Sequence, residues 1–109
     1  MADTIKILGQ SAPSATTLTD LYTVPASTQT VVSSITVCNR GATRTSFRVS
    51  TAIAGAADAN SQYIYYDVPI DANDTFIATV GITLNTTDKI RVYAGNANLT
   101  FHAYGTEVV

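Results

Sequence analysis

Charge is scarce in this chain, which also has no tryptophan, one cysteine and one histidine. Only 13% of its 109 residues are charged, about half the usual share for a globular domain. Six Lys and Arg residues against eight Asp and Glu residues leave a net charge of -2, and the basic residues are scattered. Because phosphate binding requires clustered cationic side chains, the sequence predicts no nucleic-acid partner.

The single cysteine and the single histidine argue against catalysis. Cys38 has no second cysteine with which to form an internal disulfide, and its strand-like context predicts a buried or half-buried thiol. His102 lies between Thr100 and Tyr104 on the outward face of a predicted strand, where a surface contact is favoured over a catalytic base. We therefore predict no enzyme activity, no catalytic residues and no cofactor.

The only acidic cluster lies between Asp67 and Asp74. Asp71, Asn73 and Asp74 lack the frame and the distant Glu of an EF-hand loop, and an Asx turn accounts for them better. No pattern supports a glycosidase pair formed by Asp67 and Asp71. The sequence therefore predicts no metal site and no hydrolytic site here.

Long apolar runs are also missing. No run approaches the roughly 18 residues of a membrane span, and the opening MADTIKILGQ lacks a basic segment followed by an apolar one. We expect synthesis without export, no membrane partner, and folding in a reducing compartment that suits an unpaired thiol. A length of 109 residues predicts one domain over residues 1–109.

The chain is rich in Thr and Val arranged in alternating patterns, which favours an all-β fold. Turn residues separate about eight predicted strands, at the spacing typical of sandwiches. The predicted strands are Thr4–Gln10, Leu21–Val24, Thr30–Asn39, Ser46–Ile53, Gln62–Ile70, Thr75–Leu84, Lys89–Gly95 and Leu99–Gly105. The prediction is a two-sheet antiparallel β-sandwich, and jelly-roll and immunoglobulin-like connectivities both remain open.

The stretch Leu21–Ile53 has the clearest pattern. Thr30–Asn39 is the longest predicted strand and is expected at the centre of a sheet. Asn39 and Gly41, the latter at positive φ, predict a tight turn. Ser46–Ile53 is then expected to return as the hairpin partner of Thr30–Asn39.

Alternation also assigns the faces of the strands. Pro25 and Pro69 predict strand ends or edges, and Gly81 predicts a bulge or bend that divides its strand between two sheets. The residues predicted to face the core are Ile5, Ile7, Val31, Ile35, Val37, Phe47, Val49, Ile53, Ile64, Tyr66, Val68, Ile70, Phe76, Ala78, Val80, Ile82, Leu84, Ile90, Val92, Ala94, Leu99, Phe101 and Ala103.

The same alternation predicts that several tyrosines point outward. Aromatic rings on a sheet surface pair across strands, contact other protein copies or stack on sugars, and all three interpretations remain open. Arg40, Arg44 and Arg48 are expected to form a solvated edge or the rim of an interface. The candidate interface residues are Tyr63, Tyr65, Tyr93, Tyr104, Arg44 and Arg48.

Three strings carry a resemblance: LYTVPASTQTVVSSITVCNRGATRTSFRVS, QYIYYDVPI and DTFIATVGITLNTTDKIRVYA. They resemble a small β-domain of tailed-phage virion proteins, particularly those of marine and cyanobacterial phages. In that group a Leu-Tyr-Thr-Val-Pro strand, a Val-rich strand ending in Cys-Asn-Arg and a late Asp-Lys-Ile-Arg-Val-Tyr strand recur. The likeness covers nearly the whole chain, and it brings no catalytic residues.

The resemblance implies a structural role in a virion that is assembled in the cytoplasm of the host bacterium. A capsid decoration (cement) protein is favoured, with tail, neck or baseplate accessories as further implied roles. Expected partners are the major capsid protein or tail and neck proteins, together with further copies of the chain in a homo-oligomer such as a trimer. The alternative is a carbohydrate-binding or host-adhesion module that uses the outward tyrosines and the loop Ala54–Gln62 to hold a glycan.

Overall fold

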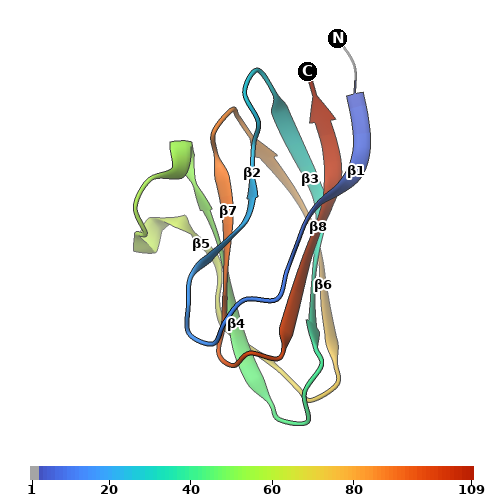
Figure 1. Cartoon of the computed structure of the whole chain (residues 1–109), viewed down its shortest axis with the longest axis vertical. Coiled ribbons are helices and arrows are strands. Elements are labelled where there is room, and N and C mark those ends of the chain that lie inside the picture. Colours follow the sequence, from blue (N-terminus) through green and yellow to red (C-terminus); the bar gives the residue numbers. More distant parts are fainter. Residues whose placement is uncertain (1–2) are drawn as a thin grey trace.

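The computed structural model describes residues 3–109 as two four-stranded antiparallel sheets packed face to face (Figure 1). This confirms the predicted all-β sandwich. The strands are β1 (Asp3–Ser11), β2 (Thr19–Thr23), β3 (Gln29–Asn39), β4 (Thr45–Ala52), β5 (Tyr63–Ile70), β6 (Thr75–Leu84), β7 (Lys89–Ala94) and β8 (Leu99–Val108). Two short 3₁₀ turns, η1 (Ile53–Gly55) and η2 (Asn60–Gln62), lie between β4 and β5.

The strand order identifies a jelly roll. One sheet runs β1-β8-β3-β6 and the other runs β2-β7-β4-β5. First strand therefore pairs with last, second with seventh, third with sixth and fourth with fifth. This pairing is that of a jelly roll, in which a long antiparallel hairpin is folded so that its paired strands alternate between two sheets. The order of the strands in each sheet differs from that of an immunoglobulin domain. The structure thus resolves the connectivity that the sequence left open.

The prediction that β3 and β4 form a hairpin is wrong. β3 lies centrally in one sheet, as expected, but β4 belongs to the other sheet, and residues 40–44 cross between them. Alternation and turn chemistry are the same whether a chain turns back within a sheet or crosses to the facing one. Gly41 also does not adopt positive φ. A side chain there would collide with Asn98, whose Nδ2 lies 2.5 Å from the Cβ position.

Asn39 stabilises the connection between β3 and β4. Its side chain is buried, and its Nδ2 donates to the backbone oxygens of Thr43 at 2.9 Å and Asp71 at 3.1 Å. Its Oδ1 accepts from the backbone N–H of Gly41 at 3.0 Å. One amide therefore satisfies the backbone of two separate connections at the same end of the sandwich, where those polar groups would otherwise be costly.

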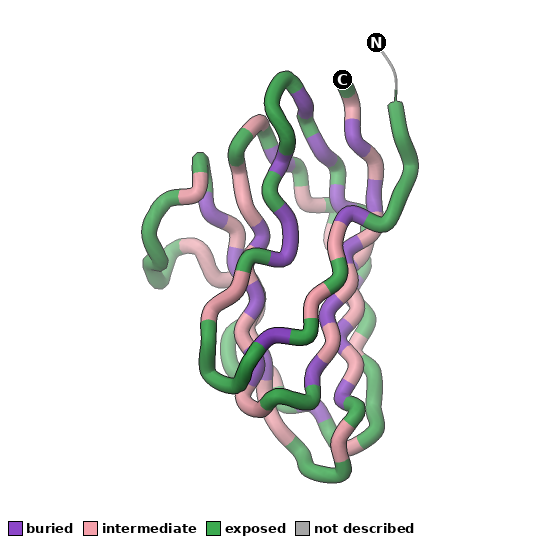
Figure 2. The backbone as a smooth tube through the Cα atoms, in the orientation of Figure 1, coloured by how far each residue is buried: buried purple, intermediate pink, exposed green. Residues whose placement is uncertain are grey.

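The core fills the space between the sheets, and Phe47 is the centre of an aromatic cluster within it. This ring is fully buried and lies 5.2 Å from the ring of Phe76 and 6.3 Å from that of Phe101, in tilted and edge-on arrangements. Aromatic pairs favour such geometries over face-to-face stacking. Along β7 and β8 buried and outward residues alternate without a break, as predicted (Figure 2).

Bulges reverse the expected faces in two strands of the β1-β8-β3-β6 sheet. The register shifts between Ile7 and Gly9 in β1, and Ile5 and Ile7 are exposed rather than inward. A second shift between Val32 and Ser34 places Val32 in the core and Val31 outside. An extra residue in a strand reverses which side chains face the core beyond the bulge. The alternation of apolar and polar residues does not show where such a bulge lies.

Gly81 forms a bulge, but β6 remains one strand. Its φ of 59° is in the left-handed region that glycine adopts at little cost. The strand runs from Thr75 to Leu84 within one sheet. The expected division into two strands is therefore wrong, although Phe76 and Leu84 keep their predicted inward positions on either side of the bulge.

The strand predicted to end at Ile53 ends one residue earlier, at Ala52. Ile53 was expected in the core, but it begins η1 and is 80% exposed. Ala54, the next residue, has a φ of 53°, which ends the extended conformation. Strands β2 and β5 are edge strands, which confirms the positions predicted from Pro25 and Pro69.

We predict that Asn39→Ala lowers the free energy of unfolding by about 1–3 kcal/mol, because it leaves buried backbone groups without partners. Urea denaturation followed by circular dichroism measures this change. Asn60→Ala is the matched control, since Asn60 is exposed in η2, and we expect its effect to stay within about 0.5 kcal/mol. Equal losses from both variants would contradict the role given to Asn39.

Candidate functional site

A stack of two tyrosines around one arginine lies on the outer face of the β2-β7-β4-β5 sheet. Arg48 on β4 lies directly opposite Tyr93 on β7 in the strand register. Its guanidinium carbon is 4.4 Å from the centre of the Tyr93 ring and 4.1 Å from that of Tyr66 on β5. Both distances are within the range of attractive cation–π contacts. We call Tyr63, Tyr66, Tyr93, Arg48 and Asp67 the Tyr–Arg cluster.

Asp67 fixes the orientation of the arginine. Arg48 Nε donates to Oδ1 at 2.7 Å and its terminal nitrogen donates to Oδ2 at 3.3 Å. The two bonds hold the planar guanidinium in a forked geometry that a lysine could not reproduce. This hydrogen bonding to Asp67 raises the pKa of Arg48 above its usual value. Asp67 itself has a φ of 52°, so a bulge in β5 turns its carboxylate toward Arg48.

Tyr63 connects the cluster to the loop between β4 and β5. Its ring meets that of Tyr66 edge-on, with centroids 5.0 Å apart and an interplanar angle of 88°. Its hydroxyl donates to Asp58 Oδ1 at 2.9 Å. Partial burial, followed by this hydrogen bond to Asp58, raises the pKa of Tyr63. Tyr63 thus links the cluster to the loop that protrudes beside β5 in Figure 1.

The structure brings together three of the six candidate interface residues, Tyr63, Tyr93 and Arg48. Tyr65 is not among them, and its expected outward orientation is wrong, because it packs on the core against Phe47 and Phe76. The remaining two, Tyr104 and Arg44, lie elsewhere.

Tyr104 and Arg44 have their own partners. Tyr104 is on the other sheet, where its hydroxyl lies 3.0 Å from His102 Nδ1. Arg44 forms an ion pair with Asp71 at 3.1 Å, and both side chains are well exposed. An exposed pair of this kind contributes little stability, because water screens it. Neither residue joins the Tyr–Arg cluster.

Sequence reasoning missed Tyr66 and misplaced Tyr65 for one reason. Register shifts in β5 between Tyr63 and Tyr65, and again before Val68, invert the alternation along this strand. Tyr66 is consequently 55% exposed, and Ile64 is also outside the core. The one available signal was the run Tyr-Tyr-Asp ahead of Pro69, since polar residues beside a proline favour irregular edge strands.

Ion pairs also hold other charged side chains of this outer face in fixed positions. Asp20 on β2 accepts from Lys89 Nζ at 2.8 Å and from Arg91 Nε at 3.2 Å. The hydrogen bond from Lys89 is the main cause of the lowered pKa of Asp20. Arg91 also donates to the backbone oxygens of Gly55 and Ala56, which ties η1 to β7. The face therefore carries both signs of charge in fixed positions.

A buried polar network joins the two sheets at the end where the chain finishes. Glu107 on β8 points inward and accepts from the Tyr22 hydroxyl at 2.6 Å and from Lys6 Nζ at 3.0 Å. The Tyr22 hydroxyl also lies 2.8 Å from Thr30 Oγ1. Sequence analysis missed this network, because its members come from four strands and no local pattern links them.

These contacts change the acidity of both buried groups. Hydrogen bonds from Tyr22 and then Lys6 hold the pKa of Glu107 below its usual value. Burial, reinforced by the hydrogen bond to Glu107, raises the pKa of Tyr22 to about 12. The glutamate is thus kept charged and the tyrosine kept protonated, as the geometry of the network requires.

Residues 3–109 contain no cluster of metal-ligand side chains. No three His, Cys, Asp or Glu side chains come together there as metal ligands require. Asp71 and Asp74 instead close a turn through a 3.3 Å backbone hydrogen bond. Cys38 is a half-buried free thiol, as predicted, and it lies opposite Thr100 rather than His102 in the register.

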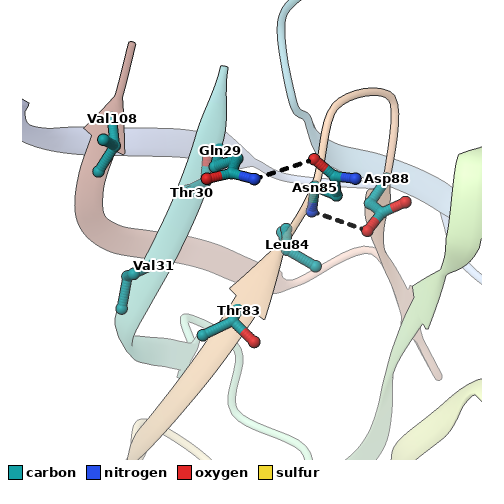
Figure 3. A pocket seen from close by; sticks show the side chains of 8 residues that line it. All are labelled: Gln29, Thr30, Val31, Thr83, Leu84, Asn85, Asp88 and Val108. Carbon is teal, nitrogen blue, oxygen red and sulfur yellow. Dashed lines mark hydrogen bonds between the residues drawn. The ribbon is translucent and has the colours of Figure 1, made fainter. Parts of the chain in front are cut away.

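Two shallow depressions mark the surface. The larger, about 480 Å³, opens between the ends of β3, β6 and β8, where Val31, Leu84 and Val108 form its apolar wall and Asp88 lies at its rim (Figure 3). The smaller, about 400 Å³, lies beside the loop and is lined by Ile53 and Gln62 among others. Neither contains converging catalytic groups among the residues described.

Comparison with protein-family models, with curated proteins and with solved structures finds no match to this chain. Within residues 3–109 no helix has the length and apolar character needed to cross a membrane. Function therefore has to be argued from the surfaces of the sandwich.

We predict that Tyr22→Phe lowers the free energy of unfolding by about 1–3 kcal/mol at neutral pH, because Glu107 and Thr30 lose a buried partner. The folded state holds the Tyr22 proton more tightly than the unfolded chain does. This contribution is therefore complete below about pH 10 and is lost as the pH rises toward about 12. Urea denaturation at a series of pH values should show the difference between wild type and variant shrinking over that range.

Tyr93→Phe is the control for this prediction. Tyr93 also loses only a hydroxyl, but it is half-buried on the outer face, so we expect a change within about 0.5 kcal/mol. A difference between wild type and Tyr22→Phe that stays constant from pH 9 to pH 12 would contradict the assignment.

Proposed function

We propose that this protein is a structural component of a tailed-phage virion that docks on the capsid or tail lattice and stabilises the particle, with a capsid decoration role favoured. The Tyr–Arg cluster is the observation that carries the proposal on the structural side. The resemblance of the chain to small virion β-domains supports it from the sequence. The expected partners are the major capsid protein or tail and neck proteins.

The composition of the cluster suits a protein interface. Tyrosine and arginine are enriched at protein–protein contacts and at the few residues that dominate binding. Here the guanidinium is held by two rings and a carboxylate before any partner arrives. Preorganisation of this kind reduces the side-chain entropy lost on binding.

The shape of the molecule supports binding by surface. The chain forms a sandwich with shallow depressions rather than a deep pocket in the part described. A jelly roll fixes its outer faces through the packed core beneath them, so a partner meets a rigid surface. Decoration of a lattice requires such a surface, repeated identically in every copy.

A sugar-binding role has less support from the geometry. Sugar stacking needs a free aromatic face, whereas one face each of Tyr66 and Tyr93 is turned to Arg48. The edge-on contact with Tyr63 occupies more of the Tyr66 ring. Tyr65, which was expected among the outward tyrosines, is packed on the core and offers no stacking face.

The test is to purify particles of the phage that encodes the chain and to determine its copy number by cryo-electron microscopy and quantitative mass spectrometry. We expect stoichiometric occupancy on the capsid or tail. In particles assembled with Arg48→Ala, occupancy at limiting protein should fall by about tenfold, as expected for the loss of one dominant contact.

Arg40→Ala is the control, because Arg40 is exposed in the crossing between β3 and β4 and its side chain donates to the backbone oxygen of Ala97, away from the Tyr–Arg cluster. Its occupancy should equal that of wild type. Particles that lack the chain altogether would refute the structural role. Equal occupancy for Arg48→Ala and wild type would remove the Tyr–Arg cluster from the docking surface.

A further inference from the structure

The outer face of the β1-β8-β3-β6 sheet differs from that of the other sheet in one respect: it carries almost no charge. The strand registers arrange its outward side chains in rows that cross all four strands. The rows are Ile5, Thr106, Val31 and Thr83; then Ile7, Tyr104, Ser34 and Thr79; then Gln10, His102, Thr36 and Ile77. We call these residues the uncharged face.

No lysine, arginine, aspartate or glutamate is present in these rows. The nearest formal charge in the strand register is Asp3, in the end row with Val108 and Gln29. Glu107 on β8 points inward and pairs with Lys6 on the edge strand β1, whose side chain stays 43% exposed. Neither of these two charges lies in the three rows of the uncharged face.

Aliphatic side chains on this face are unusually open to solvent. Ile5 is 85% exposed, Ile77 67%, Ile7 51% and Val31 43%. They lie on β1, β3 and β6, so they span the width of the sheet rather than one strand. In Figure 2 the first half of β1, beside the N-terminus, is coloured as exposed. Several exposed aliphatic side chains on one face of a sheet, with no Lys, Arg, Asp or Glu between them, suit a surface that another protein covers.

We propose that the uncharged face binds the same face of a second copy of this chain, sheet against sheet. In a two-fold interface a charge near the axis would meet its own sign, and a charge farther out would need an opposite charge on the same face. The three rows contain only Ile, Val, Thr, Ser, Tyr, Gln and His, so no Lys, Arg, Asp or Glu side chain has to be paired or repelled there. β-Branched side chains on a pleated surface also pack well against another sheet, as they do in the interior of a sandwich.

The area agrees with a reversible dimer. Four strands about 4.8 Å apart and about 30 Å long give a flat footprint of roughly 570 Å². Since side chains make the accessible surface larger than its footprint, each copy would bury on the order of 600 Å², at the lower end for specific interfaces. We therefore expect a dissociation constant in the micromolar range.

The depression in Figure 3 opens at one end of this face. Val31 and Thr83 line it, and both belong to the first row of the uncharged face. The face is thus hollowed at one end. In a dimer whose two-fold axis lies across the strands, that hollow would face the opposite end of the partner's uncharged face.

The dimer inference does not depend on the proposed virion role. Sedimentation equilibrium of the full chain, from about 1 µM to about 500 µM, should show a monomer–dimer equilibrium. Val31→Lys and Ile77→Lys should each weaken it by more than tenfold, because every substitution occurs twice in a two-fold interface. Both residues are exposed in the monomer, so circular dichroism and the urea midpoint should stay unchanged.

Ile53→Lys is the matched control. Ile53 is 80% exposed, which is at least as open as Ile77, but it lies in η1 between strands of the other sheet. We expect it to dimerise like wild type. A chain that stays monomeric throughout, one that forms trimers, or a control variant as defective as Val31→Lys would overturn the inference.

Cys38 supplies an independent readout. It is the only cysteine, it is half-buried, and it lies on the same outer face in the row beyond Thr36. In a face-to-face dimer its labelling by a maleimide should slow as protein concentration rises. The labelling rate of Val31→Lys should not depend on concentration. A wild-type rate that is independent of concentration would count against the dimer.

The outcome is separable from the proposed function. If the chain is monomeric and Val31→Lys fails to join particles, the uncharged face contacts a lattice subunit, which overturns the dimer and leaves the virion role standing. If the dimer forms but particles contain none of the chain, the dimer stands and the virion role fails.

Discussion

The pairing of β8 with both β1 and β3 is the constraint on which the rest of this structure depends. β8 is the last strand, and it lies between the first and the third in one sheet. Its inward side chains, Leu99, Phe101 and Ala103, are fully buried in the core. Through Glu107 it also reaches Tyr22 of the facing sheet. The two sheets are thus joined by a packed core and by one polar network, and the pairing of β1 with β8 brings the first and last strands side by side.

This arrangement explains why the two outer faces differ. On the β2-β7-β4-β5 sheet, charges remain outside and are fixed in pairs, with Arg48 on Asp67 and Lys89 on Asp20. On the β1-β8-β3-β6 sheet, Glu107 points into the sandwich and pairs with Lys6 at the edge of β1, and neither charge lies in the rows of the uncharged face. If two copies pack through that face, their Tyr–Arg clusters lie on the opposite, outward-facing sheets, where both remain available for docking.

Bulges decide which residues form these surfaces. In β1 and β3 they expose Ile7 and Val31, and in β5 they turn Tyr66 and Asp67 toward Arg48. Each is a local shift of one residue, yet each moves side chains from one face of a sheet to the other. The jelly-roll topology sets the two layers of the sandwich. The shifts in register determine which side chains are exposed on each outer face.

The sequence by itself determined the fold class, the position of nearly every strand and the inward faces of β6, β7 and β8, because alternation of apolar and polar residues reports burial directly. It also placed Tyr63, Tyr93 and Arg48 outside. Only the tertiary structure decided that β3 and β4 lie in different sheets, that Tyr65 is inside and Tyr66 outside, and that Glu107 meets Tyr22 and Lys6. The physical reason is that period-two alternation records which side of a strand faces the core. It does not record which strand lies alongside, nor where one extra residue reverses the phase, since both depend on contacts between residues far apart in the chain.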